Sequence, residues 1–341
     1  MNTKSRKIVY FGNKISGYRK AKSVMETLIP LFEQQYIINS YSSYQNKVLK
    51  MLDMIVNFFL KGLRAHVIII DVYSTANFYF AVILSFLSHL FKVPYILFLH
   101  GGNLPNRYTR SEKLVDYIFK NSKSIVAPSN YLKSFFEDKG YQITYIPNII
   151  NLELYQFKER KQISPKLLYI RGFGKIYNPL MAVKAIGILK EKFPSIELVM
   201  LGSDIDGTLE ETNALIKELN LSQHIKILGK MSQENWIKLS YGYDIMVSTP
   251  TIDNTPVSVI EGMALGLIIV STDVGGIAHL LKNMEDSILV ASDAHEELAS
   301  KIEFSLMNPE FSYSLQLNAR KKIEEFTWEK TKDKWFQLLN E

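Results

Sequence analysis

The sequence predicts an α/β protein made of two Rossmann-like domains, each built on a parallel sheet. Short β-branched apolar runs alternate with amphipathic helical stretches along the 341-residue chain, which is typical of parallel-sheet domains. This length is sufficient for two domains of about 150–170 residues, both able to bury a full core. Residues 155–165, YQFKERKQISP, are polar and show no apolar periodicity, so we interpret them as a linker.

The domains predicted from this pattern are residues 1–158, residues 159–325 and a final helix at 326–341. Ligands of such sheets bind at the carboxyl ends of the strands, so we expect the two domains to face each other across a ligand-binding cleft. Helical patterns such as 47–63 and 131–139 separate the strands of the first half. We expect strands at Ile8–Phe11, Val67–Asp71, Tyr95–Leu99, Ser124–Ala127, Thr144–Ile146, Leu167–Ile170, Glu197–Leu201, Ile225–Leu228, Ile245–Ser248, Ile268–Ser271 and Ser287–Val290.

The composition restricts the classes of partner. Lys and Arg exceed Asp and Glu by 40 − 34 = 6, a modest excess that favours nucleotide phosphates, lipid-linked phosphates or an acidic membrane surface. No dense basic tract is present, so nucleic acid is not an expected partner. The sequence contains no cysteine, which excludes disulfides and thiolate metal sites.

No segment has the length of a membrane span. The apolar run at Ile8–Phe11 is too short for a signal peptide. The longest apolar stretch, Phe78–Phe91, has 14 residues, fewer than the roughly 20 that a bilayer requires. We interpret it as a buried helix, with peripheral membrane contact as the alternative. The protein is therefore expected to be cytoplasmic, with loose attachment to the inner face of the membrane left open.

Residues 249–276, TPTIDNTPVSVIEGMALGLIIVSTDVGG, carry the most functional information. The order of residues predicts a loop, a helix capped at Thr255 with Pro256 at its first position, a buried strand and a glycine turn. Glu261 would lie roughly 7.5 Å along the helix from Pro256. Asp253 and Glu261 could then bind two hydroxyl-bearing parts of one elongated ligand, which is the layout of a sugar nucleotide. Acid pairs at this spacing also arise by chance, but the ordered set of acid, proline, acid, small-residue helix, strand and double glycine is much harder to produce by accident.

This segment resembles the donor-binding signature of the retaining GT-B glycosyltransferases, called glycosyltransferase group 1 or family 4. In that family two glutamates stand eight positions apart and are followed by an alanine-rich helix and a TDVGG turn. Here Glu261 is the second acid and residues 272–276 form the turn, whereas Asp253 replaces the first glutamate. The resemblance implies that the donor is bound by Thr255, Pro256, Val257, Glu261, Gly275 and Gly276, with Asp253 contacting the transferred sugar.

Two basic residues follow the first strand of the second half. Arg171 lies at the carboxyl end of the expected strand, where a guanidinium can bind a diphosphate through two parallel hydrogen bonds. The family has a lysine five positions later and then a glycine. In this sequence Lys175 comes after four positions and the glycine is missing. Arg171 and Lys175 are thus the expected catalytic cations, and a surface salt bridge is the alternative for Arg171.

The first half contributes a histidine and a glycine loop. His100 directly follows a buried strand in FLHGGN, and the resemblance places it near the donor sugar and phosphate. Gly12 and Gly17 frame the loop after the first strand, where the backbone could lie against phosphate or acceptor. The dinucleotide fingerprint G-x-G-x-x-G is absent, which argues against a dehydrogenase.

The resemblance implies a retaining, metal-independent transfer of a sugar from a UDP- or GDP-linked donor to a saccharide or lipid-linked acceptor. The C-terminal domain would hold the donor, the N-terminal domain the acceptor, and the last helix would return to the N-terminal domain. Asp204 and Asp206 form a D-x-D that in another fold would hold a metal, but two aspartates alone fall short of a coordination set. No metal or cofactor is expected. A sugar-nucleotide epimerase and a non-catalytic sugar-nucleotide binder are the alternatives.

Overall fold

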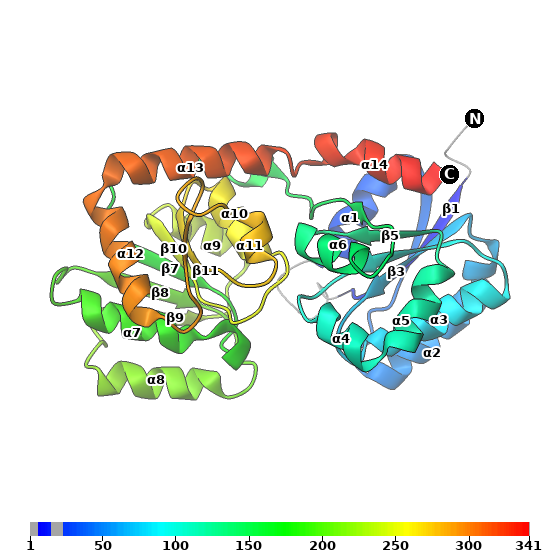
Figure 1. The fold of residues 1–341 in the computed structure, drawn as a ribbon, viewed down its shortest axis with the longest axis horizontal. Helices are drawn as coiled ribbons and strands as arrows, with labels where there is room; N and C mark the ends of the chain where they lie inside the picture. Colours follow the sequence, from blue (N-terminus) through cyan, green and yellow to red (C-terminus); the bar gives the residue numbers. More distant parts are fainter. Residues whose placement is uncertain (1–5, 15–22, 341) are drawn as a thin grey trace. The chain divides into compact units, whose positions relative to one another are not determined.

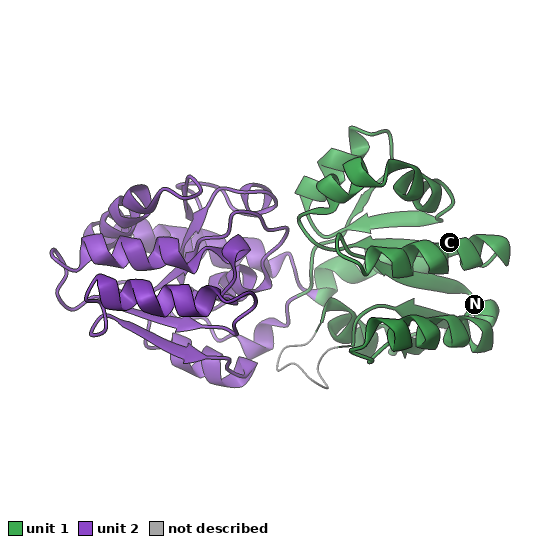
Figure 2. Cartoon of the chain, turned by 90° about the horizontal axis from the view of Figure 1, so that it is seen from below, with its two compact units in different colours: residues 1–149, 328–341 green, residues 150–327 purple. Residues whose placement is uncertain are grey.

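The chain folds into two compact units, residues 1–149 with 328–341 and residues 150–327 (Figures 1 and 2). The computed structural model describes residues 6–14 and 23–340. Each unit has a six-stranded sheet in which every strand pair is parallel, with helices packed on both faces. The predicted class, α/β with two Rossmann-like domains, is confirmed.

Unit 1 has the strand order β2-β1-β3-β4-β5-β6, so the order reverses between β1 and β3. The strands are β1 Lys7–Phe11, β2 Ile37–Tyr41, β3 Val67–Val72, β4 Tyr95–Leu99, β5 Ser124–Ala127 and β6 Thr144–Tyr145. The helices are α1 Val24–Phe32, α2 Lys47–Leu60, the 3₁₀ turn η2 Gly62–Arg64, α3 Phe78–Leu90, α4 Leu104–Arg110, α5 Glu112–Lys120, α6 Asn130–Glu137 and α14 Trp328–Asn340.

Both faces of the unit 1 sheet are buried because successive side chains on each strand point to opposite faces. On β1, Val9 packs in the cluster formed with α2, α3 and α5, whereas Ile8 and Tyr10 pack with α1 and α14. Helix α14 is the last element of the chain, yet Trp335 is 1 % exposed in this second cluster. Its ring meets Phe32 edge-on with centroids 5.3 Å apart.

Unit 2 has the strand order β12-β11-β10-β7-β8-β9, so the order reverses between β7 and β10. The strands are β7 Lys166–Ile170, β8 Glu197–Leu201, β9 Ile225–Gly229, β10 Ile245–Ser248, β11 Ile268–Thr272 and β12 Ile288–Val290. The helices are α7 Pro179–Leu189, α8 Thr208–Glu218, α9 Gln233–Ser240, α10 Val257–Ala264, α11 Ile277–Leu280, α12 His295–Met307 and α13 Pro309–Glu324, with 3₁₀ turns η3 Leu152–Leu154 and η4 Lys175–Tyr177.

All the strands predicted from the sequence are present, each within one residue of its expected ends. Strand β2 was not predicted. Its sequence, IINSY, has polar Asn39 and Ser40 where a buried strand would be apolar, and it lies at the sheet edge, paired only with β1. The apolar stretch from Phe78 forms α3, and no helix among the described residues has the length and apolar character needed to span a membrane.

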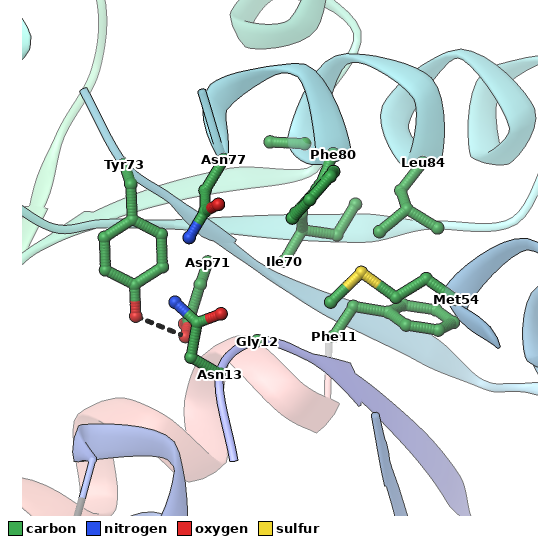
Figure 3. A pocket seen from close by; sticks show the side chains of 11 residues that line it. Phe11, Gly12, Asn13, Met54, Ile70, Asp71, Tyr73, Asn77, Phe80 and Leu84 are labelled. Carbon is green, nitrogen blue, oxygen red and sulfur yellow. Dashed lines mark hydrogen bonds between the residues drawn. The ribbon is translucent and has the colours of Figure 1, made fainter. Parts of the chain in front are cut away.

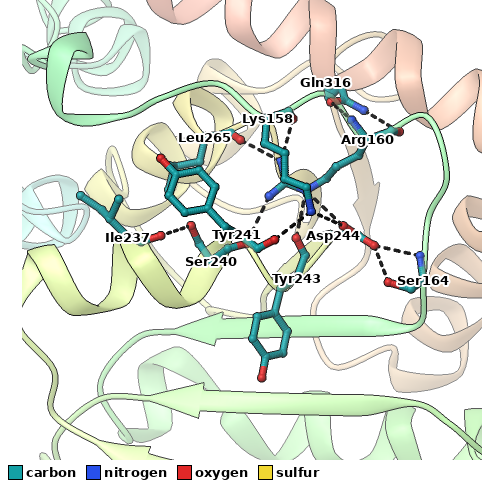
Figure 4. A network of polar contacts seen from close by, with 10 residues as sticks. All are labelled: Lys158, Arg160, Ser164, Ile237, Ser240, Tyr241, Tyr243, Asp244, Leu265 and Gln316. Atoms are coloured by element: carbon teal, nitrogen blue, oxygen red, sulfur yellow. Dashed lines mark hydrogen bonds and ion pairs between the residues drawn. The ribbon is translucent and has the colours of Figure 1, made fainter.

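The interpretation of residues 155–165 as a linker was wrong. The unit boundary lies between residues 149 and 150, and the polar segment packs inside unit 2. Arg160 is only 1 % exposed because its guanidinium donates to the backbone carbonyls of Lys158, Tyr243, Leu265 and Ser240 (Figure 4). Its charge is balanced by Asp244, whose Oδ1 lies 3.4 Å from Nε. Burial lowers the pKa of Arg160 to about 10, with the charge of Asp244 acting in the opposite direction.

Removal of the Arg160 side chain should unfold unit 2 more easily. In Arg160→Ala, four carbonyls each lose a donor and the buried Asp244 keeps only the half-exposed Lys158, 3.7 Å away, as an ion-pair partner, so we expect a loss of about 3–5 kcal/mol in unfolding free energy. Urea unfolding measures the change. Lys161→Ala, next in sequence but 71 % exposed, is the control and should change stability by less than about 0.5 kcal/mol. Equal stability of the two variants would contradict a structural role for Arg160.

Candidate functional site

The candidate site of unit 2 lies where the strand order of its sheet reverses. Arg171 directly follows β7, and Asp253 lies in the loop that follows β10. These two strands are neighbours in the sheet although they are the first and fourth of the unit. Parallel strands end at the same edge, and in doubly wound sheets the crevice at such a reversal is where ligands bind.

Arg171 and Asp253 form an ion pair between Nη2 and Oδ2. Their side chains are 22 % and 13 % exposed, so the pair is accessible from one side. The guanidinium carbon lies 4.7 Å from the centre of the Tyr177 ring, and Nε is buried without a hydrogen-bond partner among the described residues. Burial lowers the pKa of Arg171, but the neighbouring Asp253 carboxylate outweighs this and the pKa is raised overall.

The double glycine of the TDVGG turn is required by the Asp253 loop. The backbone N–H of Gly276 donates to the carbonyl of Asp253 at 2.9 Å. A Cβ on Gly276 would lie 1.6 Å from the Asn254 carbonyl oxygen, and one on Gly275 would lie 2.4 Å from that of Asp253. Gly275 also has a φ of +50°, which disfavours other residues. The backbone of the Asp253 loop therefore packs directly against the Gly275–Gly276 turn.

Helix α10 begins one residue later than predicted. Pro256 is the N-cap, with an extended ψ of 110°, and Val257 is the first helical residue. Thr255 is thus outside the helix and is not its cap, which corrects our assignment. Thr255 is 9 % exposed, whereas Val257 is 44 % exposed at the open end of the helix. The first amides of a helix lack intrahelical acceptors and suit an anion.

Glu261, the fifth residue of α10, is buried at 8 % exposure. Its Oε1 accepts hydrogen bonds from the Tyr155 hydroxyl at 2.5 Å and from Gln233 Nε2 at 2.8 Å. Burial raises the pKa of Glu261, while these two donors and the charge of Arg171 act in the opposite direction. Sequence reasoning missed Tyr155 and Gln233 because no local pattern links them to a residue 106 or 28 positions away.

Lys175 does not join the Arg171–Asp253 pair. It begins η4, its side chain is 73 % exposed, and Nζ lies 4.0 Å from Glu211 on α8. Its backbone N–H donates to Asp206. The structure therefore separates the two cations that the sequence grouped, because Lys175 begins η4 and its side chain extends into solvent.

The D-x-D aspartates organise the backbone after β8. Asp204 Oδ1 accepts from the Gly207 N–H at 3.0 Å, and Asp206 Oδ2 accepts from the Lys175 N–H at 3.0 Å. Asp206 also accepts from the Thr208 hydroxyl at the start of α8. Within residues 6–14 and 23–340, no group of three or more His, Cys, Asp or Glu side chains is placed to hold a metal ion.

In unit 1, His100 is held by a carboxylate that the sequence analysis did not identify. His100 follows β4, and its Nε2 lies 2.9 Å from Oδ1 of Asp71 near the end of β3. Asp71 is 4 % exposed and also accepts hydrogen bonds from the hydroxyls of Tyr10 and Tyr73. The Tyr73 ring stacks on His100 with centroids 5.2 Å apart.

A small pocket opens beside Asp71, again where the strand order reverses (Figure 3). It is lined by the ends of β1 and β3 and by residues of α2 and α3. Gly12 lies at its edge, and a Cβ there would approach Asp71 Oδ2 to 2.3 Å, so only glycine fits. Gly17 lies outside the described residues. Asn13 and Asn77 add amide groups to the rim.

Comparison with protein families decides the identity. The model of the family "Glycosyl transferases group 1" matches residues 153–322, which include Arg171, Asp253 and Glu261. The chain is a group 1 glycosyltransferase. It is 24 % identical over 253 residues to an uncharacterised glycosyltransferase of Methanocaldococcus jannaschii, covering 72 % of this chain and 67 % of the relative.

A second relative of this glycosyltransferase has a named activity. It is a Campylobacter jejuni α-1,4-N-acetyl-D-galactosaminyltransferase that acts on a diNAcBac-PP-undecaprenol-linked GalNAc disaccharide, 24 % identical over 256 residues, covering 73 % of this chain and 69 % of that enzyme. Among solved structures, sucrose-phosphate synthase from Thermosynechococcus elongatus matches with a TM-score of 0.80 at 15 % identity, covering 98 % of each chain. Anabaena HepE in complex with UDP-glucose matches with a TM-score of 0.74 at 14 % identity, covering 98 % of this chain and 99 % of HepE. These likenesses establish the shared GT-B fold.

Substitution of Gly276 should displace the Asp253 loop of this glycosyltransferase. In Gly276→Ala the new methyl group has no space against the Asn254 carbonyl, and we expect a loss of about 1–3 kcal/mol in unfolding free energy, measured by urea unfolding. Gly187→Ala is the control, because its Cβ would meet its nearest atom at 3.4 Å inside α7. That variant should be unchanged or up to about 1 kcal/mol more stable. Unchanged stability in Gly276→Ala would refute the contact.

The buried carboxylate of Glu261 should make stability depend on pH. Its pKa is raised in the folded protein, so ionisation costs stability as the pH rises above the ordinary value of 4.5. Glu261→Gln keeps an oxygen for Tyr155 and Gln233 but cannot ionise. We therefore expect this variant to be more stable than the wild type at about pH 7, with the difference vanishing near pH 4.

Urea unfolding across this pH range measures the effect. Glu234→Gln is the control: Glu234 is exposed, and its hydrogen bond to Lys238 holds its pKa below the usual range. Its replacement should give no gain at neutral pH. If the unfolding free energy of Glu261→Gln depended on pH as that of the wild type does, ionisation of Glu261 would not reduce the stability of the folded protein.

Proposed function

We propose that this glycosyltransferase transfers a sugar from a nucleoside-diphosphate sugar to a saccharide or lipid-linked acceptor, with retention of configuration and without a metal ion. The observation that carries the proposal is the pairing of Arg171 with Asp253 at the reversal point of the unit 2 sheet, next to α10 and Glu261. It gives one positive group for a diphosphate and two carboxylates for hydroxyls.

Arg171 is the proposed stabiliser of the departing nucleoside diphosphate. Negative charge grows on the diphosphate as the glycosidic bond breaks, and a positioned cation lowers the energy of that state. The guanidinium carbon lies 4.7 Å from the centre of the Tyr177 ring, and this contact can persist when phosphate binds. Phosphate oxygens would replace the Asp253 carboxylate on Arg171, which would free Asp253 to accept hydrogen bonds from the transferred sugar.

Glu261 is the proposed ribose ligand. Tyr155 and Gln233 both donate to Oε1, which fixes the orientation of the carboxylate. The group retains acceptor capacity for the two ribose hydroxyls, because a carboxylate has about four lone-pair sites. The amides at the start of α10, at Val257, and the Gly275–Gly276 turn complete the proposed donor site.

Unit 1 is the proposed acceptor domain. Its pocket beside Asp71 has a volume of about 10 Å³, with Asn13 and Asn77 at the rim and an apolar floor that includes Ile70 and Phe80, so it would take one hydroxyl group of the acceptor and not a whole sugar ring. His100, oriented by Asp71, is the proposed contact to the reacting sugar. With no covalent nucleophile assigned, the acceptor would attack the face that the diphosphate leaves, and the departing phosphate would take the proton.

Three lines of support favour this reading. Asp204 and Asp206, the D-x-D pair, are engaged by the backbone, and the cation next to Asp253 is Arg171. HepE binds UDP-glucose, which supports a uridine nucleotide as donor. The undecaprenol-linked substrate of the Campylobacter enzyme supports a lipid-linked acceptor. Lys175 would contribute only if its side chain left Glu211, so we assign it a minor role.

Substitution of Arg171 should abolish most transfer. Arg171→Ala removes the charge that balances the diphosphate, and we expect kcat/KM to fall by about 10²–10³-fold. Arg171→Lys keeps the charge without the paired hydrogen bonds and should be intermediate. Lys175→Ala is the control cation, with an expected loss of less than about tenfold. Release of nucleoside diphosphate from a panel of sugar nucleotides, with and without acceptor, measures these rates.

The same assay separates the alternatives. Conversion of the donor sugar without acceptor would identify an epimerase, and binding by calorimetry without turnover would identify a silent binder. Near-normal transfer by Arg171→Ala would reject the assignment of the site.

A further inference from the structure

Helix α2 carries an apolar stripe that faces solvent. Its inner side buries Lys50, Met54 and Phe58 at i, i+4 spacing against unit 1. A second set of apolar side chains recurs at intervals of three and four residues and is 39–53 % exposed: Leu49, Leu52, Val56, Phe59 and Leu63 of the adjoining η2. Amphipathic surface helices normally place polar residues at these positions, so the stripe is not explained by the fold.

Helix α3 extends this surface. Helices α2 and α3 are in contact and lie beside each other in unit 1 (Figure 1). Three apolar side chains of α3 and the residue after its C-terminal end are 44–58 % exposed: Tyr79, Phe86, Leu90 and Phe91. The Phe91 ring meets the Phe59 ring of α2 edge-on, with ring centroids 5.6 Å apart. These residues and the α2 stripe form what we term the α2–α3 face. Contiguous exposure of this kind marks an interaction surface, whereas single exposed apolar residues do not.

The exposed charged side chains of the α2–α3 segment itself, residues 46–92, all have one sign. Between residues 46 and 92, all of which are described, the exposed charged side chains are Lys47, Lys61, Arg64 and Lys92. None of them forms an ion pair with a described residue. The acids of the same span, Asp53 and Asp71, are half-buried and buried. An apolar surface bordered by unpaired cations complements an anionic lipid headgroup layer with acyl chains beneath it.

We propose that the α2–α3 face docks on a bilayer that contains anionic phospholipid. Leu52, Val56, Phe59 and Phe86 would enter the boundary between headgroups and acyl chains, and the cations would meet lipid phosphates. The inner sides of the same helices supply Met54 and Phe80 to the pocket beside Asp71. Docking would therefore place that pocket at the membrane surface. This inference stands independently of the proposed transfer reaction.

Flotation with phosphatidylglycerol and with phosphatidylcholine vesicles tests the docking. The full-length protein should co-float with phosphatidylglycerol vesicles and bind phosphatidylcholine more weakly. The variant L52Q/V56Q/F59Q should lose more than about tenfold in affinity, because interfacial binding scales with buried apolar area. Lys61→Gln and Lys92→Gln should each lose about fivefold on anionic vesicles only, and added salt should have the same effect.

A matched control removes exposed apolar residues from helices of unit 2. I188Q/M307Q/L317Q changes side chains that are 40–61 % exposed on α7, α12 and α13, and it should bind vesicles like the wild type. Thermal unfolding checks that both triple variants are folded. A tryptophan in Phe59→Trp should shift to shorter emission wavelengths on addition of phosphatidylglycerol vesicles, whereas one in Leu317→Trp should not.

Two results would overturn the proposal. Absence of binding to phosphatidylglycerol vesicles, or binding that L52Q/V56Q/F59Q leaves intact, would exclude the α2–α3 face as the docking surface. A concentration-dependent dimer that L52Q/V56Q/F59Q dissociates, without vesicle binding by the wild type, would assign the face to a second copy of the chain.

Discussion

The parallel pairing of β7 with β10 is the constraint on which the candidate site depends. Leu167 is in register with Ile245, and Tyr169 with Val247, so the two strands end side by side although they are the first and fourth of the unit. Arg171 and Asp253, 82 positions apart, are thereby brought into contact. The Gly275–Gly276 turn after the next strand, β11, then packs against the Asp253 backbone.

The site keeps its charges at a cost to stability. An arginine that is largely buried requires a counter-charge, and Asp253 supplies it. Glu261 is held as a buried carboxyl group whose pKa is raised by that burial, with Tyr155 and Gln233 limiting the penalty. Groups that are unfavourable to the fold in this way are typical of functional sites. Arg160 is different, because its charge is satisfied completely by the protein.

In unit 1, as in unit 2, polar side chains gather where the strand order reverses, but the residues are different. The strand order of its sheet also reverses, between β1 and β3, while all strands stay parallel, and its pocket lies at that point. The polar cluster there is centred on Asp71, which holds His100, whereas the floor is apolar. Helices α2 and α3 form this floor with their inner sides and the α2–α3 face with their outer sides. One pair of helices therefore links the pocket to the solvent-facing apolar surface.

The sequence by itself determined the fold class, the positions of nearly all the strands and the glycine turn at Gly275–Gly276. These features are local: a buried strand must be apolar, and a glycine turn must lack side chains wherever it lies. Strand β2 was not predicted, because an edge strand is only partly buried and its sequence therefore need not be apolar.

Only the tertiary structure decided which side chains meet. Strand order pairs Arg171 with Asp253, while the path of η4 carries Lys175 away to Glu211. The polar segment after residue 150 resembled a linker, yet it buries Arg160 against backbone carbonyls and brings Tyr155 to Glu261. The physical reason is that buried helices and strands carry apolar residues at regular intervals along the chain, which can be found in the sequence. The partner of a polar group, in contrast, depends on contacts between residues far apart in sequence.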